Sequence, residues 1–378
     1  MLPGREPSHK VIQAPPISQI LKTHNASRPK KKQASLPSRY LPGERKNYYL
    51  CARILRVASY CHHISIEVDM ETNDQYEELC RSVAAFRQTL EGLQADYRKR
   101  KGEPEYTVIS EDGKTLPFST LLAGGEGSGA NFLLRQTFNY AKERICTKKQ
   151  DEHIDSFLLF NDLLSETAMA FNLFFPLMLM QNEDPRSVTQ VLCNALGNFS
   201  INAITEIGVE YVPDLAGKYI GAHTALNAYI LWTDRRGGKR ITAITLKYAD
   251  PLSLEESGNT EMQKKLLVGS DLFIPGFGQA AGEGSVRITR LYRNFLLAER
   301  YREVNGLSDS RTVLLAPRAH PTTAAEIDSI RPWLKDEMQY KLRAITLENF
   351  VESLILYSPD FYKDAFQLFK ERYLNIPG

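Results

Sequence analysis

The chain has 378 residues, of which 43% are hydrophobic and 24% are charged, and its formal net charge is +2. This is the composition of an ordinary soluble protein, long enough to bury a large core in one elaborated domain or two. The most apolar stretch, around Phe171 to Met180, is too short to span a bilayer. We therefore expect a protein without a membrane segment.

Cysteine usage bears on the compartment and on the class of site. The five cysteines are scattered and form neither a CxxC pair nor a Cys/His cluster at zinc-ligand spacing. Unpaired thiols are typical of a reducing compartment, so the sequence predicts a cytoplasmic protein. The chain also lacks an HExxH motif and a GxSxG elbow with plausible partners, which argues against a zinc protease or an ordinary serine hydrolase.

The positive charge is concentrated at the N-terminus. Residues 1–46 contain ten Lys or Arg against Glu6 and Glu44, a balance of +8, so the remaining residues carry −6. The same segment has seven prolines and one aromatic residue, so it cannot bury enough apolar surface to order itself. We expect residues 1–46 to be a disordered tail. Its basic run from Arg28 to Lys32 suits loose contact with phosphates, and a purely solubilising role is an equal alternative.

The pattern of residues 47–204 predicts a mostly helical region. It opens with one or two strands between Tyr48 and Val68, where β-branched and aromatic residues are frequent. A glycine-rich segment, residues 123–129, lacks the spacing of a phosphate-binding loop and is interpreted as a flexible loop that leads into a helix. The expected helices cover about Asp74 to Lys101, Asp151 to Ala170 and Pro185 to Gly197.

From residue 205 the pattern changes to strands. Two β-rich segments, NAYILWT and ITAITLKY, flank Arg235 to Gly238, which is a tight-hairpin signal because glycine tolerates positive φ. We take residues 205–320 as an α/β core and 321–378 as C-terminal helices. The further expected elements are a helix over Val286 to Val304, a strand over Thr312 to Ala316, and helices over Ala324 to Met338 and Leu347 to Leu374, the last with a break at Pro359.

Five phrases stand in a fixed order along the chain. They are NDLLSETAMAFNLFFPL from Asn161, VEYVP from Val209, TALNAYI from Thr224, ITLKYAD from Ile244 and ITRLYRNFLLAERY from Ile288. In this order the chain resembles a bacterial branch of the PD-(D/E)xK restriction-endonuclease-like superfamily. That branch carries a phrase close to NLLSSxxxxFNLFxPL, then an FEyaP-like phrase, then AFD, then IExKYxE, and a helix after this core that the fifth phrase resembles. The resemblance implies an α/β (α+β) fold in which a helical N-terminal region accompanies a mixed β-sheet core flanked by helices.

The resemblance also implies roles for particular residues. Glu210 matches the upstream metal-binding acid, Lys247 matches the catalytic lysine, and Asp250 stands where the family has a trailing acid. The two acids of the signature itself are replaced by Asn227 and Thr245. In such a core the carboxylates hold Mg²⁺ or Mn²⁺ against the scissile phosphate of DNA while the lysine positions or activates water.

Several alternatives remain open. With two anions replaced, the chain is either a nuclease whose metal is held by relocated acids or a pseudonuclease that binds DNA without cleaving it. Candidate relocated acids are Glu206, Asp214 and Asp234, in addition to Glu210 and Asp250. Arg290 and Arg293 are expected to contact DNA phosphates or to form a solvated helix face, and His223 is expected near the cleft or at the surface. An interaction protein unrelated to nucleic acid is the third possibility.

Overall fold

The computed structural model describes residues 70–110, 113–149, 152, 154–213, 216–221, 225–249, 271–282 and 289–376. The chain divides into two compact units, one of Met1–Cys80 with Tyr106–Phe118 and one of Arg81–Glu105 with Ser119–Gly378. The second unit contains the large sheet and the candidate site. The expected tail and the strands expected between Tyr48 and Val68 lie outside the described residues.

The large sheet is mixed and has five strands in the order β3-β4-β5-β6-β7. The pairs β3–β4 and β4–β5 are antiparallel, whereas β5–β6 and β6–β7 are parallel. Its strands are β3 (Ile201–Tyr211), β4 (Leu226–Asp234), β5 (Lys239–Leu246), β6 (Asp309–Ala316) and β7 (Leu342–Thr346). The expected α/β architecture with a mixed sheet is therefore confirmed.

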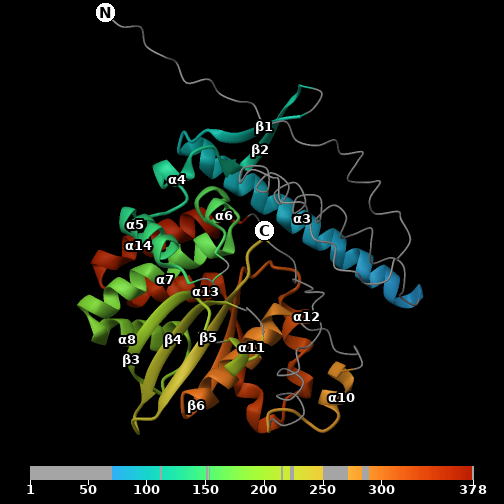
Figure 1. The fold of residues 1–378 in the computed structure, drawn as a ribbon, viewed down its shortest axis with the longest axis vertical. Helices are drawn as coiled ribbons and strands as arrows, with labels where there is room; N and C mark the ends of the chain where they lie inside the picture. The colour runs from blue at the N-terminus through green and yellow to red at the C-terminus, as the bar shows by residue number, and fades with distance from the viewer. Residues whose placement is uncertain are drawn as a thin grey trace, which may run out of the picture. The chain divides into compact units, whose positions relative to one another are not determined.

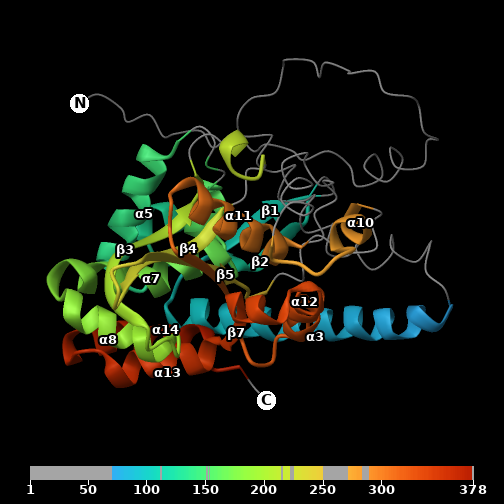
Figure 2. The same ribbon diagram turned by 90° about the horizontal axis from the view of Figure 1, so that it is seen from below.

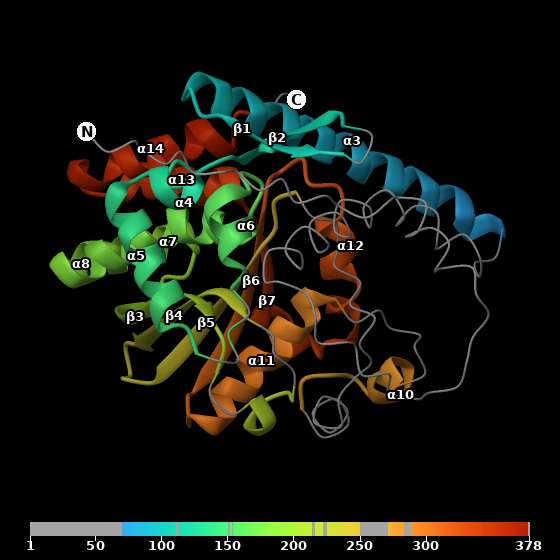
Figure 3. The same ribbon diagram turned by 45° about the horizontal axis from the view of Figure 1, so that its top comes forward.

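Helices cover both faces of this sheet. Figures 1 and 2 show α8 (Pro185–Ala195) and α13 (Leu347–Tyr357) on one face and α11 (Arg290–Val304) on the other. Figure 3 shows α11 lying along the side of β5 and β6. The helices α7 (Glu166–Glu183) and α14 (Asp360–Tyr373) complete the layer that contains α8 and α13. The sheet thus has two hydrophobic cores, one on each face.

The helix α7 is the centre of the larger core. Phe171 and Phe174 are fully buried, and the Phe174 ring lies 6.2 Å from that of Phe350. The helix starts where the Ser165 side chain accepts a hydrogen bond from the backbone N–H of Ala168, which satisfies one of the free amides of the first turn. This cap fixes the position of Glu166, the first residue of the helix.

The predicted hairpin between β4 and β5 is confirmed. Asp234 closes it by accepting hydrogen bonds from the backbone N–H groups of Arg236 and Gly238, at 2.8 and 2.9 Å. Gly237 has φ +81°, the left-handed region that glycine enters without strain. Trp232, on β4, is 1% exposed and belongs to the core.

Other expected elements differ from the structure. The helix expected over Asp151 to Ala170 is divided into α6 (Ser156–Asn161) and the start of α7, because Ser165 caps a new helix. The helix expected over Ala324 to Met338 is α12 (Thr323–Asp328) followed by 3-10 turns at Arg331–Trp333 and Asp336–Lys341. The helix α12 ends at Asp328, with Ser329 as its C-cap, and Pro332 lies in the first turn of the following 3-10 helix.

Two strand pairings were missed. The strands β1 (Glu105–Ile109) and β2 (Thr115–Leu122) form a separate two-stranded sheet. The edge strand β7 is too short to show an alternating pattern. The remaining elements include α3 (Met70–Arg100), α4 (Gly125–Ser128), α5 (Arg135–Thr147), a 3-10 turn at Ala216–Lys218 and α10 (Phe277–Gly282).

Candidate functional site

The signature residues meet at one end of the sheet. Glu210 lies near the end of β3, Asn227 near the start of the antiparallel β4, and Thr245 near the end of β5. The register pairs Val209 with Ala228 and Ala228 with Ile244, which brings the three positions together. Lys247 follows directly after β5. The expected juxtaposition is therefore present in the structure.

Asn227 makes two hydrogen bonds that occupy both ends of its amide group. Its Nδ2 donates to Glu210 Oε1 at 3.0 Å, and its Oδ1 accepts from the backbone N–H of Leu246 at 2.9 Å. The side chain is fully buried. An aspartate at this position lacks the donor for Glu210, so the amide has a structural role that a carboxylate does not fill.

Thr245 is also engaged. Its hydroxyl accepts a hydrogen bond from Asn294 Nδ2 on α11 at 2.8 Å, and both side chains are fully buried. This contact joins β5 to the helix on its face. Thr245 is thus a packing and hydrogen-bonding residue, and its single oxygen carries no charge.

Lys247 is buried with only 2% of its surface exposed. Its backbone N–H continues the parallel pairing by donating to the Leu315 carbonyl at 2.8 Å. Among the described residues its Nζ has neither a hydrogen bond nor an ion pair within 4.0 Å. A buried ammonium without a close counterion is costly, and such positions favour an incoming anion.

Glu210 is held in a strained and buried position. It has φ +44°, and among the described residues it is the only non-glycine residue with positive φ. A non-glycine residue in this left-handed conformation destabilises the fold by about 1 kcal/mol or more, and such residues cluster at functional sites. Burial raises the pKa of the Glu210 carboxyl, an effect opposed by the Arg290 charge and by the Asn227 hydrogen bond.

Glu166, which was not among the predicted site residues, belongs to the same region. Its Oε1 accepts a hydrogen bond from the backbone N–H of Tyr248 at 3.1 Å, and its Oε2 lies 3.3 Å from Arg290 Nη1. Arg290 is therefore paired with an acid inside the protein, and Arg293 is only 4% exposed. The position of Glu166 within the first family phrase was the signal that could have identified it.

Glu326, on α12, was missed as well. It is 1% exposed, and neither of its carboxylate oxygens has a hydrogen-bond partner among the described residues. Burial raises the pKa of Glu326 to about 7, an effect that the Lys247 charge opposes. No pattern in the sequence distinguished Glu326 from the other acids of the C-terminal region.

Of the other candidate acids, the two that the structure describes, Glu206 and Asp234, are not at this centre. Glu206 is on β3, and its carboxylate accepts a hydrogen bond from the Tyr229 hydroxyl. Asp234 is at the far end of β4, in the hairpin turn, where it pairs with Arg240. Asp214, His223 and Asp250 lie outside the described residues.

The described residues do not fit a divalent metal at the signature positions. Within them, no three His, Cys, Asp or Glu side chains lie close enough together to hold a metal ion. Mg²⁺ is usually bound through one or two carboxylates, yet Asn227 and Thr245 offer neutral oxygens that already accept hydrogen bonds. We therefore derive no metal-dependent step from this centre.

The family follows from comparison with known sequences. A family model described as the PD-(D/E)XK nuclease superfamily matches residues 81–375. The chain belongs to this superfamily. Neither a curated protein nor a solved structure matches the chain. This assignment confirms the resemblance at the level of the superfamily and supports a nuclease-like function. In the part of the chain that the structure describes, no helix is both long and apolar enough to cross a membrane.

Proposed function

We propose that this member of the PD-(D/E)XK nuclease superfamily binds nucleic acid, DNA in particular, without hydrolysing it by the metal-dependent route. The observation that carries the proposal is the double hydrogen bond of Asn227 to Glu210 and Leu246. It turns a metal-binding position into a neutral structural bridge, and the Thr245–Asn294 bond does the same at the second acidic position.

The binding chemistry is supported by the cations at this end of the sheet. Lys247 has no close counterion among the described residues, so a phosphate there gains a charge-assisted contact that the protein itself does not supply. Arg290 has a partly exposed side chain, 23% of its surface, and can contact a phosphate without leaving Glu166. The basic segment of residues 1–46 adds a sequence-independent attraction for phosphates.

A second candidate function is retained phosphodiester cleavage, and one observation favours it. The carboxylate of Glu326 has no hydrogen-bond partner among the described residues, although the charges of Lys247 and Arg290 act on it. Such a group is available for chemistry at a site whose own acids have been replaced.

A combined binding and cleavage assay separates the two candidates. The full chain is titrated with a fluorescent DNA duplex and a single strand in EDTA, then incubated with plasmid in Mg²⁺ or Mn²⁺. We expect salt-sensitive binding in EDTA, no cleavage, and weaker binding by Lys247→Met than by Lys218→Met, a control at an exposed lysine. Cleavage that needs metal and is lost in Glu326→Gln supports the second candidate. Absence of binding at low salt contradicts both.

A further inference from the structure

A second polar region lies at the other end of the strands from the nuclease-like centre. It contains a pocket lined by Leu196, Asn198, Thr242, Arg311, Thr312, Val313, Tyr340 and Arg343. Thr242 pairs with Arg311 near the start of β5 and β6, whereas Lys247 follows the end of β5. Five residues of extended chain separate Thr242 from Lys247, about 16 Å. The pocket is therefore distinct from the centre described above.

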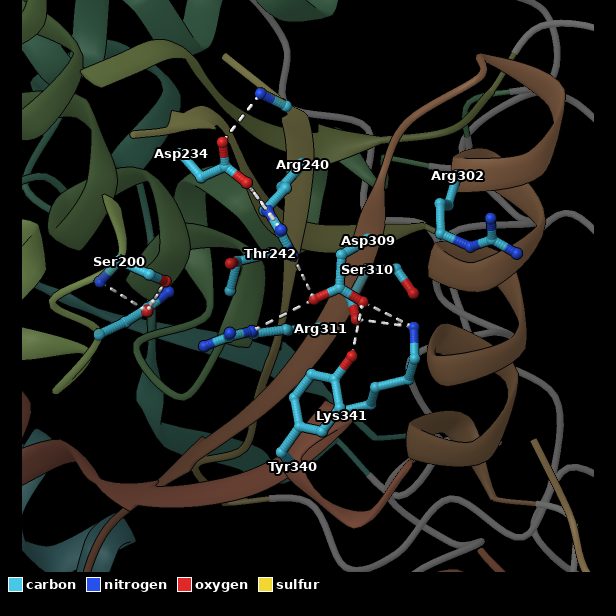
Figure 4. A network of polar contacts seen from close by, with 12 residues as sticks. Ser200, Asp234, Arg240, Thr242, Arg302, Asp309, Ser310, Arg311, Tyr340 and Lys341 are labelled. Carbon is cyan, nitrogen blue, oxygen red and sulfur yellow. Dashed lines mark hydrogen bonds and ion pairs between the residues drawn. The ribbon is translucent and has the colours of Figure 1, made fainter. Parts of the chain in front are cut away.

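The network behind this pocket pairs cations with acids (Figure 4). Asp309 alone is contacted by three cations, with Lys341 Nζ at 2.8 Å, Arg240 Nη1 at 3.0 Å and Arg311 Nε at 3.6 Å. These charges lower the pKa of the Asp309 carboxyl against the effect of its burial, so Asp309 is already ionised. Arg311 has the longest of the three ion pairs, and its charge is the least neutralised.

The side chain of Arg311 is fixed in place while the end of its guanidinium stays available. Its Cζ lies 5.7 Å from the centre of the Trp232 ring and 5.3 Å from that of Tyr340, which restricts its movement. In Figure 4 the guanidinium points away from Asp309, toward the side on which Ser200 lies. Among the described residues the two Nη atoms of Arg311 make no hydrogen bond.

The rest of the pocket adds donors and no acid. Arg343 Nη1 donates to the Leu196 carbonyl at 3.2 Å, which holds its guanidinium beside the turn after α8. Asn198 is 6% exposed, and its Oδ1 is occupied by the Ser200 hydroxyl at 2.6 Å, so its Nδ2 remains as a donor. No carboxylate is among the lining residues. Two guanidinium groups and an amide N–H₂ are the donor set that planar or tetrahedral oxyanions prefer.

We propose that this pocket binds one phosphate group, held between Arg311 and Arg343 with Asn198 as an additional donor. The pocket is narrow and partly open to solvent, so a phosphate is held by the donors at its mouth, and neither a base nor a sugar fits inside. The phosphate comes either from a nucleic-acid strand or from a free phosphate compound. The proposal does not depend on the function proposed for the Lys247 centre.

Fluorescence of Trp232 tests the proposal directly. The chain has two tryptophans, so Trp333→Phe leaves Trp232, beneath Arg311, as the only reporter. The full-length Trp333→Phe chain is titrated with inorganic phosphate at constant ionic strength. We expect a saturable change in emission. Arg343→Gln or Arg311→Gln is expected to lower the affinity for phosphate about tenfold or more, since each removes charge-assisted hydrogen bonds. Because Arg311→Gln also removes packing, the exposed Arg343 is the decisive variant.

Two controls separate this site from other effects. Arg186→Gln removes the same charge from an exposed position on α8 and is expected to leave phosphate binding unchanged within about twofold. Lys247→Met is also expected to leave it unchanged, so failure of either proposal is visible without the other. The source of the phosphate is identified by competing inorganic phosphate with a 5′-phosphorylated oligonucleotide and with an unphosphorylated one. Competition by the phosphorylated oligonucleotide alone identifies a strand end, and competition by both identifies backbone phosphate. Competition by neither identifies free phosphate. A response that does not saturate, or that Arg186→Gln weakens as much as Arg343→Gln does, overturns the proposal.

Discussion

Replacing Asn227 with aspartate places two carboxylates against each other in the core. In the wild-type protein the Asn227 amide donates to Glu210 Oε1 at 3.0 Å, and Asn227 has no exposed surface. In Asn227→Asp that donor becomes an oxygen at about the same separation. Two unit charges about 3 Å apart at an effective dielectric of about 20 repel by about 5 kcal/mol, which is the upper limit of the penalty.

The pair avoids most of this repulsion by keeping one proton, so the cost depends on pH. In the folded variant the shared proton raises the carboxyl pKa above its value in the unfolded chain. Stability is therefore retained at low pH and lost as pH rises, by about 1.4 kcal/mol per pH unit while the folded protein holds one more proton than the unfolded chain. Between pH 5 and pH 8 we expect the free energy of unfolding of Asn227→Asp to fall by up to about 4 kcal/mol relative to that of the wild type.

Urea denaturation at pH 5, 6, 7 and 8 measures this loss. The matched control is Asn227→Asp in a Glu210→Gln background, in which the second carboxylate is absent and the added pH dependence is expected to disappear. A free energy of unfolding for Asn227→Asp that parallels the wild type from pH 5 to pH 8 refutes the reasoning. It means that Asn227 and Glu210 are not paired in the folded protein.

Three further predictions concern other buried groups. Because burial raises the pKa of Glu326 to about 7, the folded protein holds a proton that the unfolded chain releases. The free energy of unfolding of the wild type is therefore expected to fall by about 3 kcal/mol between pH 4.5 and pH 7, and Glu326→Gln is expected to lack this fall in the same urea series. Lys341→Met leaves Glu299 and Asp309 without their shared cation and is expected to cost about 3 to 5 kcal/mol by urea denaturation, against less than about 1 kcal/mol for the exposed Lys370→Met. Phe174→Ala, at a fully buried position in the larger core, is expected to cost about 3 to 5 kcal/mol, whereas Phe361→Ala, with 80% exposure, costs under about 1 kcal/mol by thermal unfolding.

The parts of the fold that the sequence predicted are those with strong local signals. The hairpin at Arg235 to Gly238 has turn residues between two β-rich runs, and the break between α13 and α14 has Pro359. The edge strand β7 was missed because it is short and its pairing partner, β6, is distant in the sequence. The hairpin β1–β2 was missed because neither of its segments shows a clear strand pattern. The split of α6 from α7 depends on a cap at Ser165 that periodicity does not show.

The candidate site was predicted at the positions that belong to a motif. Asn227, Thr245, Lys247 and Glu210 stand in recognisable phrases, and the structure brings them to one end of the sheet. Glu326 belongs to the same region only through tertiary packing, because α12 is far along the chain from β5. Asn294 stands in the fifth phrase, but its hydrogen bond to Thr245 also depends on the packing of α11 against β5. The motif could not show that Asn227 and Thr245 are both hydrogen-bonded to other groups of the protein.

Calorimetric titration of the wild-type chain with MnCl₂ tests the central claim most directly. Because the signature positions carry neutral side chains whose oxygens already accept hydrogen bonds, we expect no stoichiometric binding that Glu210→Gln abolishes. The same titration of the variant carrying both Asn227→Asp and Thr245→Glu is expected to show such binding. A stoichiometric site in the wild type that is lost in Glu210→Gln contradicts the account and means that the centre still holds its metal.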